Sequence, residues 1–88
     1  MTSYRQGDIL LVLVPSIPKS ATMQESKSRI VLAYGEVTGH AHTVDAHCAT
    51  LSIAEGGVTY LTVEQLTEVT HQEHAPIPLA PGKYKVIR

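Results

Sequence analysis

Short apolar runs broken by proline and glycine constrain the fold of this chain most strongly. Residues 8–14 form an apolar run of strand length between Gly7 and Pro15, and residues 29–34 form a second one that ends at Gly35. Residues 48–54 alternate between small polar and apolar side chains, which is typical of a half-buried strand. The run at 8–14 is apolar on both faces, which predicts a strand that is buried on both sides or lines an interface.

Further runs of the same kind follow. Gly56-Gly57 is a hairpin signal between 48–54 and a return strand at 58–63. Other strands are expected at residues 36–44, 66–71 and 83–88. Residues 15–28 are polar and proline-containing, so we expect an exposed loop there. Together the runs predict one all-β domain over residues 1–88, a small barrel or sandwich of about six to seven short, mainly antiparallel strands.

The single cysteine limits how so small a domain is stabilised. Cys48 is the only cysteine among 88 residues, so no disulfide forms within the chain, and a reducing compartment is favoured. Small domains bury a modest share of their surface and commonly rely on disulfides, metals or oligomerisation. We therefore expect metal binding or assembly into a homo-oligomer.

The charge balance argues against two classes of partner. Seven Lys and Arg residues stand against eight Asp and Glu residues, and no basic stripe is present to neutralise a phosphate backbone. Nucleic acid is therefore not an expected partner. The first residues carry no signal-peptide pattern, and the longest apolar run, 9–14, is too short to span a bilayer. We expect no membrane association and a cytoplasmic location.

Histidines at short spacings carry the functional signal. Alternate residues of a strand point to the same face, so His40 and His42 are expected to project side by side. Imidazole is the commonest metal ligand, and two on one strand face supply one edge of a coordination sphere. The other ligands would come from His71 and His74, with His47 or Cys48 in reserve. The carboxylates Asp45 and Glu73 lie beside these groups in the sequence.

The position of His40 and His42 depends on the register of a hairpin expected between 36–44 and 48–54. A three-residue loop at 45–47 places both histidines on the polar face that carries Cys48, Thr50 and Ser52. A two-residue loop at 45–46 places them with the residues Ala49, Leu51 and Ile53, so that they face inward. Asp45-Ala46 lacks the glycine that two-residue loops favour, so the longer loop is preferred.

Other interpretations of the same residues stay open. The histidines are alternatively ordinary polar residues of a sheet and a solvated loop, or acid–base groups without a metal. Cys48 beside His47 suggests a nucleophile, but sequence neighbours on a strand point to opposite faces, which argues against a thiolate–imidazole pair. No catalytic residues are predicted.

Three blocks of sequence resemble an uncharacterised family of small bacterial and phage proteins. They are Gln6-Gly7-Asp8 before the first strand, the block Gly35-Glu36-Val37-Thr38-Gly39-His40-Ala41-His42, and a tail with His71, His74, Pro76-Ile77, Leu79, Pro81-Gly82 and Tyr84. The resemblance covers most of the chain and implies no activity. It places the two histidine pairs together without implying what they bind.

The sequence thus predicts a small metal-binding β domain that uses His40, His42 and one or both of His71 and His74. Nitrogen-rich ligation suits zinc, nickel or copper, with zinc first. One alternative is a non-catalytic structural or interaction module that self-associates, such as a bacterial or phage accessory protein. The other is a small-molecule pocket lined by histidines.

Overall fold

The computed structural model describes residues 3–35 and 39–88, and these residues form an all-β fold. The strands are β1 (Ser3–Gln6), β2 (Ile9–Val14), β3 (Thr22–Gln24), β4 (Arg29–Tyr34), β5 (Ala41–Asp45), β6 (Ala49–Ile53), β7 (Thr59–Val63), β8 (Thr67–Val69), β9 (Ile77–Leu79) and β10 (Gly82–Ile87). A 3₁₀ turn, η1 (Glu55–Gly57), is the one helical segment among the described residues. Within them, no helix has the length and apolar character needed to cross a membrane.

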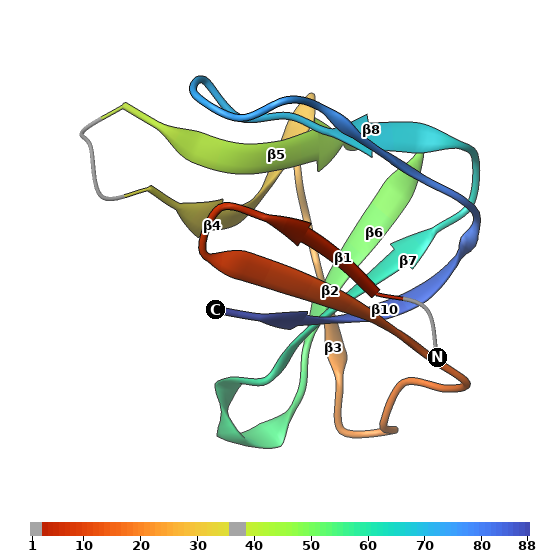
Figure 1. The fold of residues 1–88 in the computed structure, drawn as a ribbon. Coiled ribbons are helices and arrows are strands. Elements are labelled where there is room, and N and C mark those ends of the chain that lie inside the picture. Colours follow the sequence, from red (N-terminus) through yellow and green to blue (C-terminus); the bar gives the residue numbers. More distant parts are fainter. Residues whose placement is uncertain (1–2, 36–38) are drawn as a thin grey trace.

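Six of the strands form one antiparallel sheet in the order β1-β2-β10-β7-β6-β3. The ladders β4-β5 and β8-β9 form a second layer, in which β5 and the residue after β8 are joined by the bridge between Thr43 and Thr70. Figure 1 shows β5 and β8 lying across one end of the strongly twisted main sheet. Within the described residues β1 and β3 do not pair with each other, so the sheet stays open and the fold is sandwich-like rather than a closed barrel.

The core lies between the two layers, where alternate residues of each strand point inward. On β2, Ile9 and Leu11 are buried, and they belong to one core cluster with Leu61 and Tyr84 of the same sheet and Val44 of β5. The outward residues Leu10, Val12 and Val14 are only partly buried in the single chain. The structure therefore buries one of the two apolar faces of β2. The interface expected on its other face stays a prediction.

The prediction that residues 36–44 and 48–54 form a hairpin is wrong. β5 pairs with β4, whereas β6 pairs with β7 and β3. The turn between β5 and β6, in which the Cys48 N–H donates to the Asp45 carbonyl over 3.1 Å, carries the chain from one layer to the other. Neither of the two registers considered for that hairpin therefore exists. The strand β5, which carries His42, does not pair with β6.

The other expected strands are confirmed, and three additional ones are present. The hairpin at Gly56-Gly57 joins β6 to β7, with both glycines at positive φ, 83° and 81°. β1, β3 and β9 were not expected; β3 lies in the segment 15–28, which was expected to be a loop. Residues 36–38, the start of one expected strand, lie outside the described residues, and β5 begins at Ala41.

Candidate functional site

Four imidazole rings meet beside the start of β5, as the sequence predicted. The ring centroid of His71 lies 5.7 Å from that of His40 and 4.4 Å from that of His42. The ring of His74 lies 4.8 Å from that of His71 and 6.2 Å from that of His42. The cause is the antiparallel bridge of Thr43 with Thr70, whose two backbone hydrogen bonds set the next residues, His42 and His71, opposite each other.

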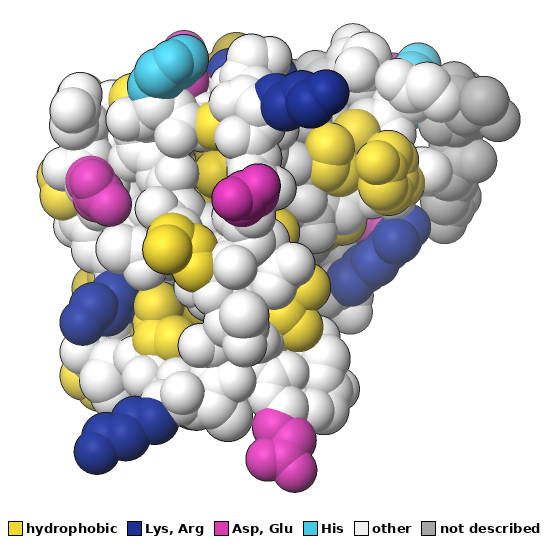
Figure 2. Space-filling view, turned by 180° about the vertical axis from the view of Figure 1, so that it is seen from behind, with side chains coloured by type: hydrophobic (Ala, Val, Ile, Leu, Met, Phe, Trp, Pro, Cys, Tyr) yellow, Lys and Arg dark blue, Asp and Glu magenta, His cyan; other side chains and the backbone are white. Residues whose placement is uncertain are grey.

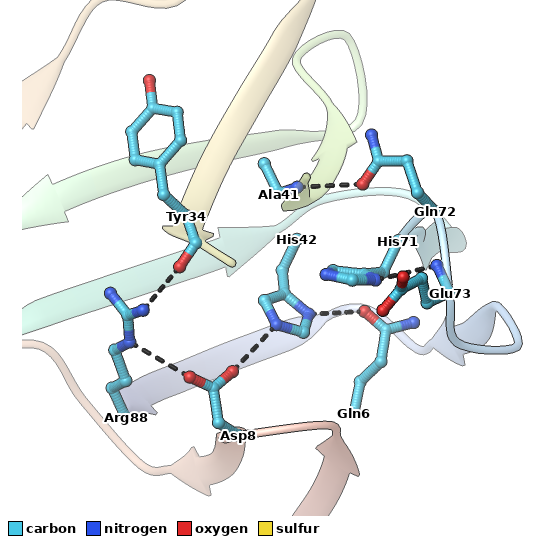
Figure 3. Close-up of polar contacts among 9 residues, drawn as sticks. All are labelled: Gln6, Asp8, Tyr34, Ala41, His42, His71, Gln72, Glu73 and Arg88. Atoms are coloured by element: carbon cyan, nitrogen blue, oxygen red, sulfur yellow. Dashed lines mark hydrogen bonds and ion pairs between the residues drawn. The ribbon is translucent and has the colours of Figure 1, made fainter. Parts of the chain in front are cut away.

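His42 is the fixed member of the cluster, because it is buried (1% exposed) and hydrogen-bonded. Its Nδ1 lies 2.8 Å from Oε1 of Gln6. The amide nitrogen of Gln6 donates to the carbonyls of Val69 and Ala75 over 3.0 and 2.9 Å, so its Oε1 faces His42 as an acceptor. Nδ1 of His42 therefore carries a proton and donates to Gln6 (Figure 3).

The other ring nitrogen of His42 faces a carboxylate. Nε2 lies 3.1 Å from Oδ1 of Asp8, whose Oδ2 accepts from Nε of Arg88 over 3.2 Å. Burial lowers the pKa of His42, and the hydrogen bond to Asp8 offsets part of this effect. The pKa of Asp8 is lowered, first by the His42 hydrogen bond and then by Arg88. When Nε2 carries no proton, two acceptor atoms face each other across 3.1 Å.

The turn 71–74 packs beside His42, and one ring nitrogen of the cluster is buried without a hydrogen-bond partner among the described residues. The Ala41 N–H donates to Oε1 of Gln72 over 2.9 Å, and the Glu73 N–H donates to Nδ1 of His71 over 3.0 Å (Figure 3). Nδ1 of His40 is buried and has no hydrogen-bond partner among the described residues. Its nearest carboxylate oxygen, Oε1 of Glu73, lies 3.6 Å away, which is beyond hydrogen-bond distance.

A glycine lets the first turn approach the rings. Gly7, between β1 and β2, has φ +58°, and a Cβ there would lie 2.6 Å from Nε2 of His74 and 3.3 Å from Cε1 of His42. The backbone between Gln6 and Asp8 is thereby held directly against two of the imidazoles.

The reserve ligands are not part of the cluster. His47 and Cys48 follow the opposite end of β5, where His47 is exposed and its Nδ1 lies 3.0 Å from Oδ1 of Asp45. At about 3.3 Å per residue, that end of the strand is roughly 10 Å from His42. The structure therefore brings His40, His42, His71 and His74 together and places His47 and Cys48 elsewhere.

Sequence reasoning missed the roles of Gln6 and Asp8. Their only signal was the block Gln6-Gly7-Asp8, in which a turn glycine stands between two polar residues before an apolar strand. Local patterns do not reveal that both side chains reach one imidazole on β5.

The rings pack against one another instead of aiming their nitrogens at one point. Among the described residues, no three His, Cys, Asp or Glu side chains are arranged to hold a metal ion. An ion bound by three or more of these groups therefore requires some of them to move.

The comparisons with known proteins place the chain in a family. A family model described as Domain of unknown function (DUF8820) matches residues 5–88. The chain belongs to the DUF8820 family. The match confirms the expected membership of an uncharacterised family, and the DUF8820 description names no activity. No curated protein and no solved structure matches the chain significantly.

Proposed function

We propose that the histidine cluster binds a divalent transition metal ion, zinc in the first place, and that Nε2 of His42 and the carboxylate of Asp8 are its first two ligands. The observation that carries the proposal is the 3.1 Å separation of Nε2 of His42 and Oδ1 of Asp8 beside two further imidazoles. When Nε2 of His42 carries no proton, both atoms are acceptors, and a cation bound to both replaces their mutual repulsion by two attractive contacts.

The spacing of the two atoms suits a shared ion. Zinc lies about 2.0–2.2 Å from nitrogen and oxygen ligands, so adjacent ligand atoms of a tetrahedral site are roughly 3.3 Å apart. The observed 3.1 Å is close to that separation. Nδ1 of His42 donates to Gln6 Oε1 at 2.8 Å, which is the outer-shell contact that fixes the tautomer and orientation of metal-bound histidines.

The turn 71–74 is the source of the remaining ligands in this proposal. Residues 72–74 are exposed and belong to no strand, so they can shift with little loss of core packing. His74 is the third ligand, because its Nε2 is close to the Gly7 backbone, next to Asp8 in the chain. Nδ1 of His40, which has no hydrogen-bond partner among the described residues, is a further buried nitrogen that gains from an ion nearby.

Zinc affinity, measured by competition with a chromogenic chelator, tests the ligand assignment. The metal-free chain is expected to bind one zinc ion, and Asp8→Asn or His74→Ala to weaken binding at least about tenfold. Both positions are exposed, so the variants are expected to fold, which circular dichroism checks. His47→Ala is the matched control, because its exposed imidazole lies outside the cluster, and its zinc affinity should equal that of the parent.

Two results would overturn the proposal. One is the absence of zinc binding by the parent chain at micromolar concentrations. The other is an equal loss of affinity in His47→Ala and His74→Ala, which would indicate non-specific binding by surface imidazoles.

A further inference from the structure

A groove lies where β4 and β10 end and β7 begins. Its volume is about 570 Å³, within the range of small-molecule sites. Its apolar lining comes from all three segments and includes Leu32, Ala33, Val58, Val86 and Ile87. Tyr34, which is 67% exposed, also lines it. Among the described residues no histidine lines the groove, although its lining residue Arg88 also contacts Asp8 beside the histidine cluster.

The charged residues in the described lining of the groove are basic. Lys85 and Arg88 line it, and none of the lining residues that the structure describes is acidic. The guanidinium of Arg88 is partly occupied by Asp8 and by the Tyr34 carbonyl, to which it donates over 2.6 Å. In the described part of the chain, no carboxylate lies within 4.0 Å of the Lys85 ammonium, which leaves its charge available to a ligand.

Figure 2 shows hydrophobic side chains scattered among acidic and basic ones, over the face seen from behind. A second groove, lined in part by Arg29, Leu66 and Pro78, also has Asp45 and Glu68 in its lining, whereas the described lining of the groove at β10 includes basic residues and no acidic one.

We propose that this groove binds a small carboxylic acid with an apolar chain. The apolar residues receive the hydrocarbon, whose burial supplies the main driving force. Lys85 receives the carboxylate, and the free N–H groups of Arg88 contribute positive charge at the same end of β10. A second copy of the chain fits less well, because the volume is that of a small-ligand site and a symmetric contact would bring the lysines of both copies together.

The proposal is tested with octanoate and its neutral analogue octan-1-ol, each titrated into the ¹⁵N-labelled chain and followed by amide chemical shifts. Octanoate is expected to shift the amides of Ala33, Val58 and Val86 and to bind about fivefold more tightly than octan-1-ol. Lys85→Gln should remove this preference. Lys83→Gln is the matched control, because Lys83 lies on the same strand but outside the groove, and should retain it.

A third variant tests the apolar floor without changing any charge. Val58→Phe narrows the groove and is expected to weaken both ligands to a similar extent. The inference is overturned if octanoate shifts amides elsewhere or none, if octan-1-ol binds equally well to the parent, or if Lys83→Gln reduces the preference as much as Lys85→Gln. None of these outcomes depends on zinc, so they are independent of the metal proposal.

Discussion

Saturating zinc is expected to raise the midpoint of thermal unfolding of the metal-free chain by about 10–20 °C. A ligand that binds only the native state adds about 2.7 kcal/mol at a free concentration 100 times its Kd. For a domain of this size each kcal/mol raises the midpoint by about 4–8 °C. The measurement is a circular dichroism melt with and without zinc chloride, and excess EDTA should restore the original midpoint.

The ligand variants separate this stabilisation from a general effect of zinc. In Asp8→Asn and His74→Ala the increase should be much smaller, whereas His47→Ala should show the full increase. An unchanged midpoint for the parent chain at saturating zinc would show that no ion is linked to folding.

Replacing Gln6 by methionine is expected to lower the free energy of unfolding by about 2–5 kcal/mol. Gln6 is 4% exposed, and its amide binds the carbonyls of Val69 and Ala75 and the Nδ1–H of His42. Methionine has a similar shape but leaves all three groups without this partner, and the two buried ones, the Val69 carbonyl and the Nδ1–H of His42, are costly to leave unsatisfied. Urea denaturation followed by circular dichroism measures the change.

Gln65→Met is the control for this substitution. Gln65 is exposed, and surface substitutions of this kind usually change stability by less than about 0.5 kcal/mol. If Gln6→Met proves as stable as Gln65→Met, then the amide of Gln6 does not hold His42, and the fixed tautomer on which the metal proposal rests is lost.

The meeting of the two histidine pairs could be predicted from the sequence, but the partners of His42 could not. Alternation along a strand indicated that His40 and His42 act together. The contacts of His42 with Gln6 and Asp8 join residues 36 and 34 positions apart, and they depend on how the first turn packs under β5. No local pattern carries that information.

The strands themselves could largely be predicted from the sequence, but their pairing could not. Strands with clear apolar patterns, such as β2, β4 and β10, were predicted close to their observed bounds. The pairing of β5 with β4 was not, because the segment 45–48 looks like a hairpin turn although it passes between layers. β3 and β9 were missed because each is three residues long and is held by backbone pairing, with Pro78 inside β9.

The most direct test of the metal proposal is a zinc titration of the metal-free chain followed by the imidazole ¹⁵N resonances. We predict that one equivalent of zinc shifts Nε2 of His42 to the value of a metal-bound nitrogen, leaves its Nδ1 protonated and leaves both nitrogens of His47 unchanged. Resonances of His42 that stay where they were at saturating zinc would contradict the account.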